Sequence, residues 1–324
     1  MLRAKLQVDN AKINLGVSSD SPTLEQAHDI FICVLGYESR CTYVASEIEK
    51  SSQPNSTKFA VTFPDRQVFS FEENKAWFDE KKFVYLNFSG YKFRQQVIAQ
   101  LESGSYKKNK EISIFIDISC MSRLLMAELI LALVILSKER KVSVTFLYAP
   151  AEFSQPSKGN PLITIAEPVV PDFAGWSVPG LPTYAIFGLG FEYDRAIGSL
   201  ELLDPARSWA LMPVGENPKF EHEIKGANRN LEDFLFENII SEYRLDRPVD
   251  LFLRLQSLVS GLAQEAKVVI VPLGPKLFAL TSLLVGLVSN SSVAVWRVSG
   301  GQADLPVDSE PTGKIIKFHT TFER

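Results

Sequence analysis

Short apolar runs alternate with amphipathic segments along the first half of the chain. Five runs have the continuous hydrophobicity of strands that are covered on both faces, at residues 29–35, 58–63, 83–88, 111–119 and 142–150. Helical periodicity follows three of them, at residues 42–50, 92–103 and 121–139. This alternation predicts an α/β fold with a parallel sheet of the Rossmann kind and helices on both faces.

The same order of patterns begins again after residue 182. Strands are expected at 184–190, 208–214, 266–274 and 291–298, and helices at 193–203, 230–243, 250–264 and 275–287. Residues 153–182 are rich in Pro and Gly, which is typical of a connector between domains. We therefore predict a first Rossmann-like unit over residues 1–152, a connector over 153–182, and a second unit over 183–324.

The two ends of the chain have patterns of their own. Residues 2–17 alternate apolar and polar positions and predict a hairpin that turns near Asp9 and Asn10. The tail at residues 313–322 predicts one added edge strand.

Landmarks in the two halves recur at a nearly constant spacing. The separations are 154 residues from Gly36 to Gly190, 155 from Arg40 to Arg195, 153 from Arg123 to Lys276, and 150 from Phe59 to Trp209. Four landmarks in one order indicate two tandem copies of a single α/β unit, produced by internal duplication.

Composition and charge narrow the classes of function. The 324 residues are 46% hydrophobic and 22% charged, which fits a globular protein of about two domains. The net charge of −4 gives no overall attraction to nucleic acid, so direct nucleic-acid binding is not expected. The three Cys and three His have neither zinc-site nor disulfide-framework spacing, and we expect no metal and no cofactor.

The amino-terminal residues lack the apolar core of a signal peptide. The longest apolar run, at residues 124–136, is too short to span a bilayer. These patterns predict a soluble cytoplasmic protein with no membrane partner.

Two similar phrases follow the first strand of each unit, at the sheet edge where α/β proteins bind ligands. They supply Gly36, Tyr37, Glu38 and Arg40 in the first copy, and Gly190, Phe191, Glu192 and Arg195 in the second. The arginine offers a fork for phosphate or carboxylate. The glutamate would orient that arginine, accept a ribose hydroxyl, or act as a base. In the alternative interpretation, each glutamate pairs with its own arginine near a helix N-terminus and has no other role.

A second pair of candidates follows the strongest strand of each unit. The loops contain Asp117, Ser119, Cys120, Ser122 and Arg123 in the first copy, and Gly274, Pro275 and Lys276 in the second. Each loop ends in a cation at the start of an apolar helix, a position that favours a bound anion. Alternatively, Ser119 or Ser122 caps the helix, and Pro275 occupies its first turn. Neither loop matches a Walker A or GxGxxG motif.

Further candidates lie nearby. Trp296 would stack on a base and Arg297 would contact a phosphate, unless Trp296 belongs to the core and a glycine turn follows it. Asp117, Glu38 and Glu192 are the candidate catalytic carboxylates, although Asp117 is also placed to cap a helix or to pair with Arg123. A helix N-terminus predicts a lowered thiol pKa for Cys120, but no neighbouring histidine supports a nucleophile, and we interpret Cys120 as structural.

The segments DISCMSRLLMAELILAL and PLGPKLFALTSLLVGL each follow a hydrophobic strand. This arrangement resembles the CARF-type Rossmann sensor domains of bacterial and archaeal antiviral systems. The resemblance implies binding of a nucleotide-like ligand between two copies of the domain, which a fused duplication would supply within one chain. The Gly-Gly-Thr-Lys form that is usual in those domains is absent.

Three hypotheses follow. The first is a sensor or adaptor that binds a nucleotide-like anion in a crevice between the units, through Arg40, Arg123, Arg195 and Lys276, and signals to a protein partner with effector activity in a defence or signalling complex. The second is an enzyme on a nucleotide or phosphorylated substrate with a Glu or Asp base. The third is a non-catalytic subunit of a complex, in which the repeated phrases are only structural.

Overall fold

The computed structural model describes residues 2–8, 11–51, 56–63, 67–103, 110–155, 162–176, 178–215, 217–232, 240–289, 292–301 and 304–324. The chain forms two compact units, one made of residues 1–152 and 306–324 and the other of residues 153–305. The described residues contain no helix that is both long enough and apolar enough to cross a membrane.

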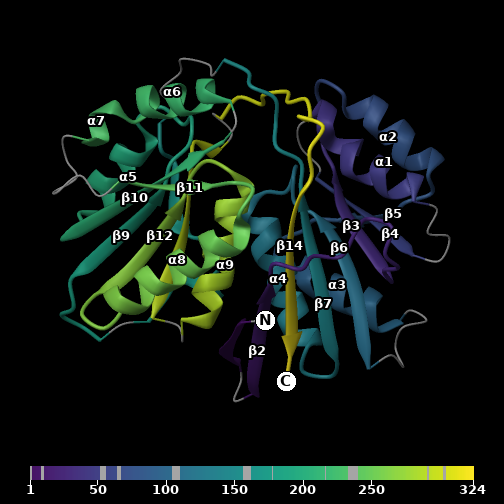
Figure 1. The fold of residues 1–324 in the computed structure, drawn as a ribbon, viewed down its shortest axis with the longest axis horizontal. Helices are drawn as coiled ribbons and strands as arrows, with labels where there is room; N and C mark the ends of the chain where they lie inside the picture. The colour runs from purple at the N-terminus through teal and green to yellow at the C-terminus, as the bar shows by residue number, and fades with distance from the viewer. Residues whose placement is uncertain are drawn as a thin grey trace. The chain divides into compact units, whose positions relative to one another are not determined.

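The first unit is built on an eight-stranded sheet with the order β1-β2-β14-β7-β6-β3-β4-β5 (Figure 1). Its strands are β1 (Leu2–Val8), β2 (Ala11–Ser18), β3 (Ile30–Leu35), β4 (Thr57–Thr62), β5 (Val84–Asn87), β6 (Glu111–Asp117), β7 (Lys141–Tyr148) and β14 (Ile316–Glu323). Strands β3 to β7 pair in parallel, whereas β14 pairs antiparallel with both β7 and β2.

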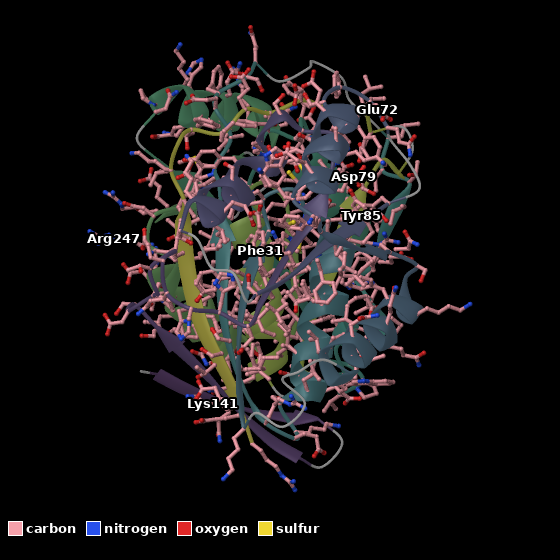
Figure 2. The ribbon with its side chains drawn as sticks, turned by 90° about the vertical axis from the view of Figure 1, so that its right-hand side faces the viewer. Phe31, Glu72, Asp79, Tyr85, Lys141 and Arg247 are labelled. Carbon is pink, nitrogen blue, oxygen red and sulfur yellow. The ribbon has the colours of Figure 1, made fainter. Side chains whose placement is uncertain are left out.

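Helices cover both faces of the parallel part of this sheet. They are η1 (Ser39–Thr42), α1 (Tyr43–Lys50), α2 (Phe71–Glu80), α3 (Tyr91–Ser103) and α4 (Arg123–Leu136). Helices α1 and α2 pack on the β3 face that carries Phe31, Cys33 and Leu35, and Phe31 lies deep among the side chains in Figure 2. Every residue of β3 is buried, which explains why its sequence is apolar throughout rather than alternating.

The second unit has a six-stranded sheet with the order β11-β10-β9-β12-β13-β8. Its strands are β8 (Ile165–Pro168), β9 (Thr183–Gly188), β10 (Arg207–Val214), β11 (Ile240–Arg244), β12 (Lys267–Pro272) and β13 (Val293–Ser299). Its helices are η3 (Pro171–Phe173), α5 (Arg195–Leu203), α6 (Pro218–Ala227), α7 (Arg229–Glu232), α8 (Pro248–Leu262) and α9 (Lys276–Val288).

Both units order their five parallel strands in the same way. Numbered along each unit, the strands lie in the order third, second, first, fourth, fifth, and an antiparallel strand then joins the fifth. The predicted α/β class is confirmed, and the two similar sheets are consistent with a tandem duplication.

The chain is divided differently from the expected division. The tail forms β14, which lies between β2 and β7 inside the first sheet instead of adding an edge strand. The expected connector contains β8, which completes the second sheet through antiparallel pairing with β13. Each antiparallel strand therefore follows one set of parallel strands in sequence and pairs with the other set. No local sequence pattern states which sheet a short apolar segment will join.

Two finer expectations also need comment. The helix predicted over 230–243 is wrong at its end, because residues 240–244 form β11 and pair in parallel with β10. The predicted hairpin forms from β1 and β2, and its turn residues Asp9 and Asn10 lie outside the described residues.

Candidate functional site

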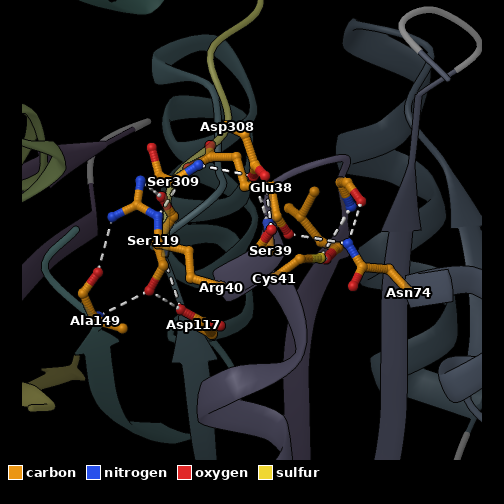
Figure 3. Close-up of polar contacts among 12 residues, drawn as sticks. Glu38, Ser39, Arg40, Cys41, Asn74, Asp117, Ser119, Ala149, Asp308 and Ser309 are labelled. Carbon is orange, nitrogen blue, oxygen red and sulfur yellow. Dashed lines mark hydrogen bonds and ion pairs between the residues drawn. The ribbon is translucent and has the colours of Figure 1, made fainter. Parts of the chain in front are cut away.

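The first repeated phrase folds around the side chain of Arg40, at the carboxyl edge of β3, β6 and β7 (Figure 3). Its guanidinium donates from Nε to Glu38 Oε2 at 2.8 Å. It also donates from Nη1 to the Ala149 carbonyl at 2.9 Å and from Nη2 to the Ser119 carbonyl at 3.1 Å. One side chain thus joins the loops that follow three strands.

Burial decides what Arg40 can do. The residue is 6% exposed. Burial is the largest single influence on the pKa of Arg40 and would lower it, but the charge of Glu38, its hydrogen bond and the nearby Cys120 and Tyr148 together outweigh burial and raise the pKa. The guanidinium thus has three acceptors within the first unit, and one of them is the glutamate of its own phrase.

Asp117 lies beneath Arg40 and serves the same loop. Its Oδ1 accepts hydrogen bonds from the Ser119 backbone N–H at 2.9 Å and from the Ser119 hydroxyl at 2.5 Å. The Ser119 hydroxyl oxygen in turn accepts a hydrogen bond from the Ala149 N–H at 2.8 Å. Burial raises the pKa of Asp117 to about 6. Asp117 is 3% exposed, so this carboxyl fixes the β6–α4 loop and is remote from solvent.

The cysteines of this edge are structural in their contacts. The Cys41 thiol donates to the Val34 carbonyl at 3.0 Å and accepts from the Gly36 N–H at 3.1 Å. A hydrogen bond with Cys41, together with burial, raises the pKa of the Cys120 thiol well above its ordinary value. The lowered pKa expected for Cys120 is therefore wrong, because burial and the Cys41 contact outweigh the helix N-terminus.

Two residues that the sequence analysis did not identify, Asn74 and Asp308, hold the turn after β3. Asn74 donates its amide to the carbonyls of Gly36 and Glu38, each at 3.0 Å. In the second unit, Asn228 donates to the Gly190 carbonyl at 2.9 Å. Asn228 follows Asn74 by 154 residues, the same spacing as the two glycines, so the repeat spacing was a signal that could have found both.

Asp308 is the second residue that holds the turn after β3, and its local sequence contains no motif that would have predicted this role. Its Oδ1 accepts from the Ser39 N–H at 2.7 Å, and its Oδ2 accepts from the Ser39 hydroxyl at 2.7 Å. The Arg40 N–H donates to the neighbouring Ser309 carbonyl at 2.9 Å. Burial is the largest single influence and would raise the pKa of Asp308, but the hydrogen bonds from Ser39 and from the Ser309 N–H together outweigh it and lower the pKa. An internal carboxylate thus occupies the start of η1.

The second phrase uses its arginine in a similar way. Arg195 is 8% exposed and donates from Nη2 to Asp304 Oδ1 at 2.5 Å and from Nη1 to Oδ2 at 3.3 Å. Asp304 Oδ2 also accepts from the Gly300 N–H at 2.9 Å. Arg40 and Arg195 each fasten the segment that leaves the fifth strand of their own unit, at Ala149 and at Asp304.

The two glutamates differ. Both oxygens of Glu192 accept from the Gly274 N–H at 3.2 Å, so this carboxylate occupies the β12–α9 loop that was predicted to hold an external anion. Glu38 has a side chain that is 16% exposed, and only its Oε2 binds Arg40. Within the part of the chain that the structure describes, Glu38 Oε1 accepts no hydrogen bond.

The packing around the first glycine of each phrase also differs between the two units. A Cβ added to Gly190 would lie 2.3 Å from Gly274 Cα, so the loops after β9 and β12 touch through their backbones. A Cβ added to Gly36 would meet nothing nearer than Cys120 Cβ at 3.5 Å. The neighbouring loops are closed on each other in the second unit and less tightly packed in the first.

The remaining predicted site residues are scattered over these edges. Ser122 caps α4 by accepting from the Leu125 N–H at 3.1 Å. Arg123 and Lys276 begin α4 and α9 as expected and are half-buried, and Pro275 takes the capping position instead of the first helical turn. Trp296 is half-buried against the second core, and Arg297 pairs with Glu167 of β8.

Aromatic rings accompany both glutamates. Tyr37 lies 5.9 Å from the ring of Phe69, which is 58% exposed and has a left-handed backbone with φ of 49°. The residue after Phe69, Ser70, shares a hydrogen bond of 3.1 Å with the Ser39 hydroxyl. In the second unit, Phe191 stacks on Phe220 at 5.4 Å, and Phe153 packs edge-on against both. The first unit therefore has an exposed ring, Phe69, next to the residue that precedes its glutamate, whereas the second unit packs its rings on each other.

No group of three or more His, Cys, Asp or Glu side chains that could hold a metal ion occurs among the described residues. No family model matches the chain, and no curated protein matches it. The solved structures to which the chain is similar include the cytoplasmic domain of a prokaryotic cation chloride cotransporter. The two chains are 8% identical, with a TM-score of 0.27 over 86% of this chain and 97% of that chain. A likeness at this TM-score carries no argument about function.

Proposed function

We propose that the protein is a non-catalytic sensor or adaptor that binds a nucleotide-like ligand at the carboxyl edge of its first unit. The observation that carries the proposal is the carboxylate of Glu38, which pairs with Arg40 through Oε2 and accepts no hydrogen bond at Oε1 among the described residues. The residue before it, Tyr37, has its ring 5.9 Å from that of Phe69. A partner protein would carry the effector activity.

The chemistry of this rim favours the nucleoside part of such a ligand. An exposed aromatic ring stacks on a base at about 1–3 kcal/mol per base. A fixed carboxylate oxygen accepts hydrogen bonds from ribose hydroxyls, as acidic residues do in other dinucleotide-binding α/β proteins. Phe69 pays a conformational cost for its left-handed backbone, and such residues cluster at ligand sites.

The internal pairing of Arg40 and Arg195 changes the predicted mode of binding. Arg40 and Arg195 already have carboxylate partners, so neither would supply a phosphate contact without breaking a buried ion pair. The proposal therefore places recognition on Glu38 and the aromatic pair. It does not require both copies of the phrase to act.

Asp117 supports a binding role over an enzymatic one. A general base has to reach the proton that it abstracts, and Asp117 is buried and engaged with Ser119. Under the enzyme hypothesis, Glu38 is the better placed base, and turnover of a nucleotide panel with and without Mg²⁺ would reveal it.

The experiment is a thermal-shift panel of nucleotides and cyclic oligonucleotides on the wild type and two matched variants. A ligand at a hundred times its Kd stabilises by about 2.7 kcal/mol, which raises the Tm by about 5 °C or more. Glu38→Gln keeps an acceptor for Arg40 but loses the charge, and we expect it to abolish the shift. Glu192→Gln should leave the shift unchanged. If no member of the panel raises the wild-type Tm, the proposal fails.

A scaffold subunit is the second candidate, and the internal use of both phrase arginines favours it. In that case the repeated phrases only fasten the fold, and the wild type and Glu38→Gln would respond equally to every nucleotide.

A further inference from the structure

Two free thiols of the first unit lie in contact at the carboxyl edge of its sheet. Cys120, in the loop after β6, is half-buried and makes a hydrogen bond with the thiol of Cys41 in η1. Cys41 is 1% exposed. Because Cys41 gives its own proton to the Val34 carbonyl, Cys120 is the donor between the two sulfur atoms. Solvent therefore reaches this pair of thiols through Cys120.

Contacts other than the sulfur atoms hold the two segments together. Arg40, next to Cys41, donates from Nη2 to the carbonyl of Ser119, next to Cys120, at 3.1 Å (Figure 3). A Cβ added to Gly36 would lie 3.5 Å from Cys120 Cβ and 3.8 Å from Cys41 Sγ. The two thiols thus meet beside Gly36, on segments that are already joined, and their sulfur atoms have only a short distance to close before they bond.

We propose that Cys41 and Cys120 are a redox-sensitive pair, which a low-molecular-weight disulfide such as oxidised glutathione converts into an intramolecular disulfide. The Cys120 thiolate attacks the small disulfide, forms a mixed disulfide and releases one thiol. The Cys41 thiolate then attacks Cys120 Sγ, so that the protein disulfide forms and the second small thiol leaves. The two protons of the protein thiols end on the two released thiols, and the small disulfide is reduced as the pair is oxidised.

Oxidation changes the turn that carries Glu38. The hydrogen bond from Cys41 to the Val34 carbonyl is lost with its proton, and a covalent bond joins η1 to the β6–α4 loop. Any consequence for ligand affinity rests on the proposed function, because Glu38 lies in this turn. The disulfide itself does not rest on it.

The environment of Cys120 sets the speed of the reaction. Burial and the contact with Cys41 raise the pKa of Cys120, so little thiolate is present at neutral pH. We expect the rate of oxidation to rise about tenfold per pH unit between about pH 7 and pH 9, because the thiolate is the attacking species. A rate that stays constant over this range would show that Cys120 is not the first thiol to attack.

The test is oxidation of the full chain with oxidised glutathione, followed by alkylation of the remaining thiols in denaturant and peptide mapping without reductant. We expect one pair of peptides, linked through Cys41 and Cys120. Cys33→Ala is the matched control, since it removes a buried thiol that donates to the Phe59 carbonyl, and it should leave the link unchanged. Three free thiols, a lasting glutathione adduct on Cys120, or a link through Cys33 would each overturn the proposal.

Two further variants separate the steps. Cys41→Ala should stop at the glutathione adduct on Cys120, because the resolving thiol is gone. Cys120→Ala should take up no glutathione at Cys41, and an adduct there would contradict the proposed order. The wild type alone decides whether the link forms, so the test does not depend on the folding of a variant. Because no nucleotide is used, failure here leaves the thermal-shift test standing, and the reverse is also true.

Discussion

Carboxylates of the same chain accept hydrogen bonds from backbone N–H groups in the loops where the sequence predicted a bound anion. Asp308 binds the Ser39 N–H, Asp117 binds that of Ser119, and Glu192 binds that of Gly274. Backbone donors at such loops and helix starts favour any nearby anion. The sequence indicated where the donors would lie. It offered Glu192 and Asp117 as internal partners in the alternative interpretations, but it gave no sign of Asp308, which comes from a segment 269 residues away from Ser39.

Asp117 makes stability depend on pH. Its pKa is raised from 3.8 to about 6 in the folded state, chiefly by burial, so the folded state holds the proton more tightly than the unfolded state does. Its contribution is present below about pH 4 and is lost as the pH rises through about 6. The loss is on the order of 3 kcal/mol. Asp117→Asn keeps an acceptor for Ser119 and cannot titrate.

Urea unfolding of the wild type and Asp117→Asn at pH 4 and pH 7 checks this. We expect the free energy of unfolding of the wild type to fall relative to that of the variant between the two pH values. Other titrating groups are common to both proteins and cancel in the difference. A difference that does not change with pH would show that Asp117 titrates as an ordinary carboxyl.

At the scale of elements, the sequence predicted the central strands and the helices that begin with Arg123 and Lys276. It missed α2 and misread β11 as helix, because amphipathic periodicity in short segments is weak. The repeated phrases were correctly placed after the first strand of each unit. The Glu38–Arg40 pair was one of the two interpretations of the first phrase, and the spacing of Asn74 and Asn228 repeats that of the glycines, but the other partners of the phrases had no sequence signal.

The two loops after the first strands should tolerate a methyl group very differently. Gly190→Ala would place Cβ 2.3 Å from Gly274 Cα, so the backbone has to shift. We expect a loss of about 3 kcal/mol of stability from this overpacking. Gly36→Ala meets Cys120 Cβ at 3.5 Å, an ordinary contact, and should change stability by less than about 1 kcal/mol. Denaturant unfolding of both variants measures this, and equal losses would contradict the packing difference.

At the scale of the whole molecule, the two similar units exchange their antiparallel strands. The strand that follows the parallel strands of one sheet, β8 or β14, pairs with the other sheet. The repeat spacing in the sequence predicted the duplication, and the common strand order of the two sheets agrees with it. The sequence could not predict which sheet β8 and β14 would join, because a short apolar segment can pair with the edge of either sheet. The exchange of strands makes residues at the carboxyl terminus part of the first unit.

Amide hydrogen exchange in two matched variants of the full chain tests most directly which sheet the carboxyl-terminal strand β14 belongs to. Phe322 in β14 and Phe187 in β9 are both fully buried, and replacing either with Ala costs about 3–5 kcal/mol. We predict that Phe322→Ala accelerates exchange first in β6 and β7 of the first unit, and that Phe187→Ala does so first in β10 and β12 of the second. Faster exchange of β12 and β13 ahead of β6 and β7 in Phe322→Ala would contradict the account, because it would assign the tail to the second sheet.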